Sequence, residues 1–297
     1  MTDGFILVDK PGGWTSHDVV ARTRNLMAER RVGHAGTLDP MATGLLVLGL
    51  GRATRLLRFV QHLTKVYVAE VVFGVATDTL DATGAVLSRE PMPVSEEEVK
   101  QASSRFVGRI RQVPPMVSAL HIGGRRLYDL AREGKEVERE ARAVEVYSIE
   151  VTDFSPCDYP EATLRVSCGS GTYVRTLADD IGRALGGRAH LKGLRRHRIG
   201  SLRIDEAYTM AGIEAAVAEA DGERLVLDCA TGLRDLPAVR VTTETAAAVR
   251  NGVTFPAPVL GIATPAEGLH RVLDQVGQLL AVYRVEGRAA RPEVVVA

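Results

Sequence analysis

Apolar and polar positions alternate along several short segments of the chain, as they do in half-buried β-strands. The clearest case is 65–74, whereas 5–9 is a short apolar run that is also expected to be a strand. Segments 144–154 and 161–168 are expected to be two paired strands. The run 44–50 is apolar without a polar break, so it predicts a buried segment that is either helical or extended.

Capping residues mark where helices begin. Ser16 is expected to cap a helix that runs to Met27. Ser95 and Glu98 have the spacing of a capping box, which predicts a helix from there to about Phe106. Further helices are expected at three other segments, namely 127–133, 173–185 and 210–220, whereas the Gly-rich stretch 32–43 is expected to be a loop.

The pattern changes after a linker near 235–237. From there on, short Val- and Leu-rich segments are separated by Gly and Pro, which predicts a small β-barrel. The larger part mixes antiparallel strands with helices and is therefore of the α+β class. We expect two domains, 1–235 and 236–297.

Composition excludes several classes of protein. The 297 residues are 45% hydrophobic, with 37 Lys and Arg against 37 Asp and Glu. No apolar run approaches the roughly 18 residues of a membrane span, and the N-terminal residues do not resemble a signal peptide. Three cysteines are too few for a disulfide framework in a chain of this size. We expect a soluble, cytoplasmic protein.

The charges are unevenly distributed although they sum to zero. Segment 101–128 has five arginines and no acidic residue, and 181–204 has seven cationic residues and no acid. Such blocks can form a cationic face for a polyanion such as a nucleic acid. They can equally be the solvated faces of surface elements, and the charges alone do not decide between the two.

Candidate chemistry gathers in the Gly-rich segment 33–44. It has neither the Gly-Lys-Ser/Thr ending of a P-loop nor a Gly-x-Gly-x-x-Gly fingerprint. Asp39, held before Pro40, can be a turn-capping residue or a catalytic carboxylate. His34 lies five residues earlier, but no third ligand accompanies the two, so no metal site is expected.

Several blocks of residues follow one another in the order of a known family. They are VDKP at 8–11, WTS at 14–16, GHAGTLDPMATG at 33–44, KVY at 65–67, TDTLDATG at 77–84, QVPPMVSAL at 112–120, GSGTYVRTL at 169–177 and LRR at 194–196. In these blocks the chain resembles the TruB family of bacterial transfer-RNA pseudouridine synthases, which isomerise uridine 55 of the T loop.

The resemblance implies a fold, a reaction and a partner. The fold is a mixed, largely antiparallel sheet with flanking helices and a central cleft, followed by a PUA-like β-barrel. An insertion at about 113–142 grips RNA, and the barrel contacts the acceptor end of the transfer RNA. The reaction uses neither a metal nor a redox cofactor, the T arm is the substrate, and no obligatory protein partner is implied.

The resemblance also assigns roles to single residues. Asp39 is the catalytic carboxylate, which either attacks the substrate or removes a ribose proton. Arg175 is its cationic partner, Tyr67 lies under the flipped uracil, and Leu194 lines the uracil pocket. Independently of the resemblance, a cation in the first turn of a helix opposes the helix dipole, so Arg175 requires a compensating anion.

The remaining implied residues bind substrate. His34 fills the space left by the flipped nucleotides, and Arg125 and Arg126 contact phosphates. Lys10 and Tyr173 belong to the same set. Two alternatives stay open: an RNA-binding module without catalysis, which would have no reason to keep an acidic residue in an RNA cleft, and an RNA-guided relative, which would usually carry basic extensions.

Overall fold

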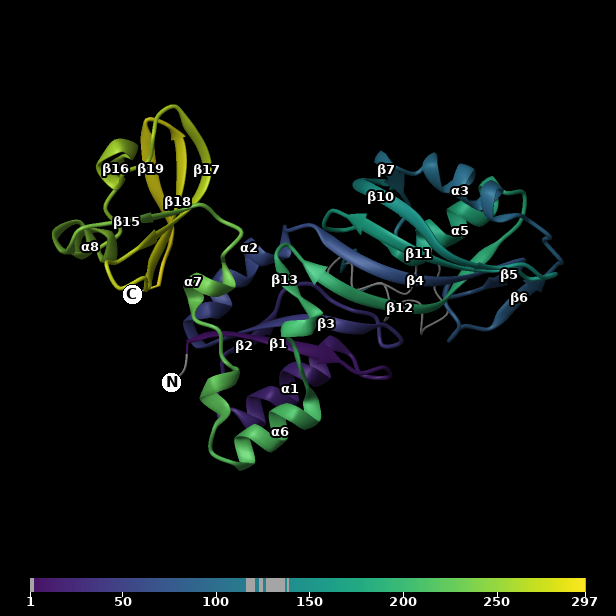
Figure 1. The fold of residues 1–297 in the computed structure, drawn as a ribbon, viewed down its shortest axis with the longest axis horizontal. Helices are drawn as coiled ribbons and strands as arrows, with labels where there is room; N and C mark the ends of the chain where they lie inside the picture. The colour runs from purple at the N-terminus through teal and green to yellow at the C-terminus, as the bar shows by residue number, and fades with distance from the viewer. Residues whose placement is uncertain (1–2, 116–120, 123–124, 127–136, 138, 297) are drawn as a thin grey trace.

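The computed structural model describes residues 3–115, 121–122, 125–126, 137 and 139–296. It shows an elongated molecule with a large sheet in the middle and a smaller sheet at one end (Figure 1). Within the described residues the large sheet has ten strands. Eight follow one another in the order β14 (Tyr208–Thr209), β1 (Gly4–Lys10), β3 (Thr43–Leu50), β12 (Ala189–Ile199), β4 (Lys65–Phe73), β11 (Glu161–Cys168), β10 (Arg142–Ser155) and β7 (Gly108–Gln112). The other two are β13 (Leu202–Arg203), beside β12, and β2 (Val32–His34), beside β3.

Most neighbouring strands of this sheet are antiparallel. The pairs β1 with β14 and β12 with β3 are parallel. The predicted mixed, largely antiparallel sheet is therefore confirmed. So are the strand expected at 65–74 and the expected pairing of 144–154 with 161–168, which the structure shows to be antiparallel.

The apolar run 44–50 forms the buried strand β3. Its side chains alternate between two hydrophobic cores. Leu46 and Leu48 pack with residues of two helices on one face, and Leu45 and Val47 pack into a separate cluster on the other. A strand covered on both faces has no polar side to show in its sequence, which explains the unbroken run.

In the described part of the chain, two pairs of helices pack on the large sheet (Figure 1). One pair, α1 (Ser16–Leu26) and α6 (Met210–Ala218), packs on β1 and β3. The second pair, α3 (Glu96–Ser104) and α5 (Val174–Ala184), packs on β4 and β11. The predicted capping box at the start of α3 is confirmed.

The predicted N-cap of α1 is wrong by one residue. Thr15 is the cap: its hydroxyl accepts a hydrogen bond from the Asp18 N–H, and the Asp18 carboxylate accepts one from the Thr15 N–H. Ser16 is buried instead. Its hydroxyl donates to the Leu38 carbonyl (3.2 Å) and accepts from the Leu38 N–H (2.9 Å). Both residues suit a cap, and a tertiary contact decides between them.

The smaller sheet lies at the C-terminal end and is a curled half-barrel, which confirms the barrel-like tail expected from the sequence. Its order is β15 (Ala238–Arg240), β17 (Ala266–Leu273), β18 (Leu279–Gly287), β19 (Ala289–Val295) and β16 (Phe255–Pro256), with α8 (Thr243–Arg250) beside it. Leu279, Val282 and Val294 share one hydrophobic core with Phe5 and Val47. The two sheets are therefore joined by apolar packing.

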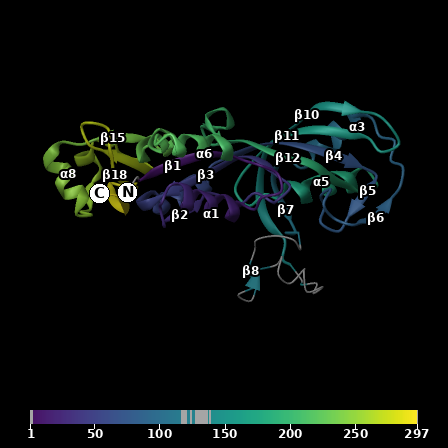
Figure 2. The same cartoon turned by 90° about the horizontal axis from the view of Figure 1, so that it is seen from below.

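Short elements connect these layers. The stretch 32–43, expected to be wholly a loop, begins with β2, which pairs with β3. The predicted helix at 127–133 lies outside the described residues, next to a hairpin that stands away from the sheet in Figure 2. None of the described helices is long and apolar enough to cross a membrane. The remaining elements are η1 (Gly51–Leu56), α2 (Leu57–Gln61), β5 (Val75–Thr77), β6 (Val86–Arg89), β8 (His121–Ile122), β9 (Arg125–Arg126), η2 (Ile204–Glu206), η3 (Gly222–Leu225), α7 (Cys229–Gly232) and η4 (Ala257–Leu260).

Candidate active site

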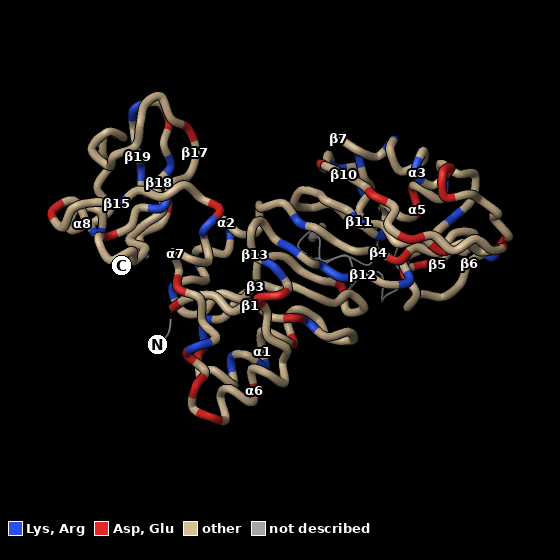
Figure 3. The backbone as a smooth tube through the Cα atoms, in the orientation of Figure 1, with Lys and Arg blue, Asp and Glu red and all other residues tan. Residues whose placement is uncertain are grey.

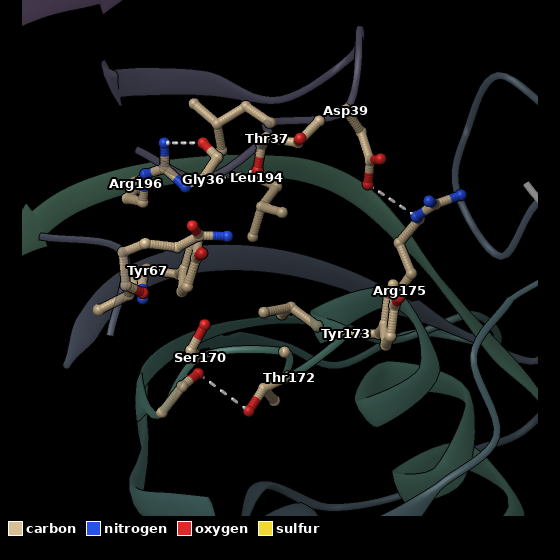
Figure 4. Close-up of a pocket in the computed structure, with 16 residues that line it drawn as sticks. Gly36, Thr37, Asp39, Tyr67, Ser170, Thr172, Tyr173, Arg175, Leu194 and Arg196 are labelled. Carbon is tan, nitrogen blue, oxygen red and sulfur yellow. Dashed lines mark hydrogen bonds and ion pairs between the residues drawn. The ribbon is translucent and has the colours of Figure 1, made fainter. Parts of the chain in front are cut away.

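A pocket of about 380 Å³ opens where the loop between β2 and β3 meets β4, β12 and the start of α5. Figure 4 shows side chains from all of these elements directed into it. Of the nine site residues predicted from the sequence, the pocket brings together Asp39, Tyr67, Tyr173, Arg175 and Leu194.

Asp39 and Arg175 face each other across the pocket (Figure 4). Asp39 Oδ2 lies 2.9 Å from Arg175 Nε. The arginine side chain is 3% exposed, whereas the Asp39 side chain keeps 33% of its surface exposed. Arg175 lies in the first turn of its helix and was expected to need a compensating anion. Asp39 is such an anion.

A second carboxylate, Asp81, holds the same arginine. Its Oδ2 lies 3.3 Å from Arg175 Nη1, which also donates to the Thr79 carbonyl at 3.0 Å. Oδ1 of Asp81 accepts hydrogen bonds from the Thr79 hydroxyl (2.8 Å) and from the Thr83 N–H (3.0 Å). Asp81 is buried, so both the acid and the arginine have little freedom to move. Asp81 lies in the TDTLDATG block at 77–84, and no role in the site was predicted for it.

Burial is the largest influence on the pKa of Asp39, and it raises that pKa above the ordinary value of 3.8. The Arg175 guanidinium opposes this effect, and the negative charge of Asp81 adds to it. The result is a carboxylate with a raised pKa whose charged form is favoured mainly by the Arg175 guanidinium. Such a carboxylate can act on a substrate as a nucleophile or a base.

Tyr67 and Leu194 form the apolar part of the pocket. They come from the neighbouring strands β4 and β12, and the exposed fraction of each is 9%. Burial raises the pKa of the Tyr67 phenol, so this side chain is uncharged at neutral pH. A flat neutral ring beside a leucine provides a surface on which a planar base can stack.

Arg196 is a pocket residue for which the sequence analysis assigned no role in the site. It is 1% exposed, and its guanidinium lies 6.0 Å from the Tyr67 ring centroid. Nε donates to the Leu45 carbonyl (2.7 Å) and Nη2 to the Gly36 carbonyl (3.0 Å). Arg196 therefore holds both ends of the loop that carries Asp39. Its backbone also passes so close to Gly44, which has a positive φ, that a Cβ there would lie 2.4 Å from the Arg196 carbonyl oxygen.

Lys10 lies behind the loop and is not among the residues that line the pocket. Its ammonium group is buried and donates to the carbonyls of Trp14 (2.6 Å), Pro11 (2.8 Å) and Pro40 (3.3 Å). Burial lowers the pKa of Lys10 to about 8, and the nearby Asp39 charge partly opposes this. The lysine ties the loop next to Asp39 to the end of β1.

The other predicted binding residues occupy different places. Tyr173 lines the pocket as the N-cap of α5, and its N–H donates to Gln112 Oε1 at 3.0 Å. His34 lies on β2, outside this pocket. Arg125 and Arg126 form β9, and their side chains lie outside the described part of the chain. Among the described residues no three His, Cys, Asp or Glu side chains gather as metal ligands would.

Most of the cationic block at 181–204 is engaged within the protein. Several of its positions follow one another along β12 in the middle of the molecule (Figure 3). Ion pairs join Arg183 and Arg188 to Asp179, Lys192 to Glu161, Arg195 to Asp9 and Arg203 to Asp205. With Arg196 buried, the block is much less basic toward solvent than its sequence indicates.

Comparison with known proteins agrees with this geometry. The N-terminal domain of TruB family pseudouridylate synthases matches residues 24–174, and the C-terminal domain of tRNA pseudouridylate synthase B matches 175–234. The chain is 46% identical over 291 residues to tRNA pseudouridine synthase B of Moorella thermoacetica, covering 96% of this chain and 95% of that protein. The corresponding protein of Thermobifida fusca is 49% identical over 221 residues, which cover 72% of this chain and 75% of the relative.

Solved structures show the same fold. A crystal structure of a Cbf5–Nop10–Gar1 complex contains a chain with a TM-score of 0.77 and 27% identity, covering 99% of this chain and 85% of that one. A chain in an H/ACA ribonucleoprotein bound to a substrate RNA has a TM-score of 0.76 and 25% identity, with coverage of 99% and 85%. The described geometry and these matches together show that the chain belongs to the TruB family of pseudouridine synthases, isomerases that convert uridine to pseudouridine in transfer RNA.

Proposed function

We propose that this protein isomerises uridine 55 in the T loop of transfer RNA, with the target base turned out of the loop into the pocket beside Asp39. The observation that carries the proposal is the Asp39–Arg175 pair, which places an accessible carboxylate next to the stacking surface of Tyr67 and Leu194. A base within a folded RNA loop must leave its stack before a side chain can reach its glycosidic bond.

The reaction balances without an external reactant. The bond from ribose C1′ to N1 breaks, the uracil turns, and a bond forms from C1′ to C5. C5 loses its proton, and N1 gains one. Asp39 would act either by attack on the substrate or by removal of a ribose proton, and both need its ionised form. Arg175 favours that form by opposing the effect of burial.

The roles of the other pocket residues follow from their positions. Tyr67 would stack on the uracil, with Leu194 against the same base. Arg196 and Lys10 would act as positioning residues, because each holds the Asp39 loop through backbone carbonyls. Lys10 was predicted to bind substrate, and we now propose instead that it positions the Asp39 loop. His34 would occupy the space that the flipped nucleotides leave.

The rest of the RNA would be held outside the pocket. We assign the T arm to the insertion at about 113–142, with Arg125 and Arg126 on phosphates, and the acceptor end to a PUA-like domain at 236–297. Residues 1–235 would form the catalytic domain. The protein would act in the cytoplasm without an obligatory protein partner, although the Cbf5 chains of similar fold are found in complexes with Nop10.

Tritium release tests the proposal directly. Unmodified transfer RNA labelled with tritium at C5 of its uridines is incubated with the protein in EDTA, and tritium released to water is counted. The expected result is release of about one equivalent per RNA, because one C5–H bond breaks per isomerisation. Release must be lost when the T-loop uridine is replaced by cytidine.

Two other results would contradict the proposal. Release that persists with the cytidine RNA would show that the protein acts on another uridine. Tight binding without release would favour an RNA-binding module, in which Asp39 is only a structural residue of its loop.

A further inference from the structure

A second hollow of about 650 Å³ lies next to the active-site pocket, between α1, β2 and the η1–α2 segment. Its walls carry four arginines and two histidines from three separate stretches of chain, namely Arg24, Arg30, Arg31, Arg58, His17 and His34. As far as the described residues go, no Asp or Glu lines it.

Acidic residues lie next to some of the arginines in this hollow. Arg58 pairs with Glu293 at 3.1 Å, and the Glu29 carboxylate accepts the Arg31 backbone N–H at 2.8 Å. No ion pair of Arg30 is found among the described residues, and its side chain is exposed. Arg30 thus differs from most cations of the 181–204 block, which are paired with acids.

Two buried polar atoms in the wall have no hydrogen-bond partner within the described structure. They are Arg24 Nε and His34 Nδ1. A buried polar group without a partner is unfavourable, and a bound ligand or water is one explanation for its presence in a native structure. Arg24 Nη2 donates to the Val32 carbonyl at 2.8 Å, which fixes the direction of the guanidinium. Burial lowers the pKa of His34, and the charges of Arg196 and His17 lower it further, so the arginines supply the positive charge here.

The hollow and the active-site pocket are neighbours. Gln61 lines both of them. The chain also runs directly from one to the other, because His34 lies in the hollow and Gly36 to Asp39 line the pocket. A polymer with one nucleotide in the pocket would therefore extend over Gln61 into the hollow.

We propose that this arginine-lined hollow binds backbone phosphates of the RNA strand whose uridine occupies the active-site pocket. The inference rests on the proposed function. Arginine suits this ligand because its planar guanidinium binds phosphate oxygens in pairs. A free phosphate compound has the same chemistry, but the continuity of the hollow with the pocket favours phosphates on a strand that passes through both.

The test is the salt dependence of RNA binding. The double variant Arg30→Gln with Arg31→Gln changes two exposed side chains of the hollow. Arg22→Gln is the matched control, because Arg22 lies on the same helix as Arg24 but pairs with Glu214 outside the hollow. The dissociation constant of an unmodified T-arm hairpin is measured for each protein from about 50 to 200 mM salt.

We expect the double variant to bind the hairpin roughly tenfold more weakly at the low-salt end and to lose about one unit of the log–log salt slope per phosphate contact removed. The control should keep the wild-type affinity and slope. Thermal melting must show that both variants are folded.

An unchanged affinity and slope in the folded double variant would overturn the inference. If inorganic pyrophosphate then binds the wild type but not the double variant in calorimetry, the hollow serves a free phosphate compound, and the RNA assignment is wrong. Pseudouridine formation by the wild type on the same hairpin is assayed in parallel. Its absence would contradict the proposed function, whereas its presence with unchanged binding by the variant would contradict only this inference.

Discussion

Arg175 and Asp39 form an ion pair in which the two partners differ sharply in exposure. The arginine is 3% exposed and the carboxylate 33% exposed, at an Nε–Oδ2 distance of 2.9 Å. The buried partner is also held by Asp81, so its position does not depend on Asp39 alone. The accessible partner faces the pocket. The pocket therefore contains an accessible carboxylate whose cationic partner is buried and held in place.

Replacing Asp39 by Asn should abolish isomerisation while the affinity for transfer RNA stays within about threefold of wild type. The amide keeps the shape of the side chain and removes the charge that acts in the transition state. Arg175 retains Asp81, so the fold is expected to persist. Tritium release and RNA binding are measured on the same preparation. Turnover by this variant would contradict the assignment of Asp39.

Asp81→Asn should lower the turnover rate by about 100-fold with little change in RNA affinity, because Arg175 loses the Asp81 anion and with it the geometry of Asp39. Asp78→Asn is the control, since Asp78 belongs to the same turn but is exposed and accepts a hydrogen bond from the Ala85 N–H. Single-turnover rates separate the effect from product release. Equal losses in the two variants would show that the turn as a whole, rather than Asp81, matters.

Local features of the fold were predictable because they depend on neighbouring residues. The capping box at Ser95 and the strand at 65–74 are each specified within a few positions. The anion required by Arg175 was also predictable, because a cation in the first turn of a helix is unfavourable by itself. The motif blocks, by their order along the chain and their resemblance to a known family, predicted the rest of the fold correctly.

Residues placed by tertiary contacts were not predictable in this way. Asp81 looks like any turn residue until the hydrogen bonds between the Leu80–Ala82 backbone and Leu191 bring its loop to Arg175. Arg196 looks like one more surface cation in a basic strand, and its burial depends on the close approach of the Gly36 loop. In both cases the residue's place in the site depends on contacts with residues that are distant in the sequence.

The activity should fall on the acid side at a pH above the ordinary Asp range. Burial raises the folded-state pKa of Asp39 above 3.8, and the protonated form is inactive, so the rate rises with pH through that raised pKa. The single-turnover rate of tritium release is measured from about pH 3 to 8. An acid limb centred at or below 3.8 would contradict the inferred desolvation of this carboxyl.

Arg175→Gln should shift the same acid limb to higher pH, because the guanidinium lowers the pKa of Asp39 and the amide cannot. A lower maximal rate is expected as well, since Asp39 loses its partner at 2.9 Å. Arg183→Gln is a suitable control on the same helix, because Arg183 pairs with Asp179 rather than with Asp39. A limb that stays in place in the Arg175 variant would show that the pair does not set the protonation of Asp39.

Thr15→Ala and Ser16→Ala should separate the stability of α1 from the placement of Asp39. Thr15→Ala removes the helix cap and should cost about 1 kcal/mol of unfolding free energy with activity retained. Ser16→Ala leaves the buried N–H and carbonyl of Leu38 without their partner, at about 1–3 kcal/mol. Because Leu38 directly precedes Asp39, this variant should also turn over more slowly. Denaturant unfolding and tritium release are compared for both proteins, and equal activity in the two would show that Ser16 supports only the helix.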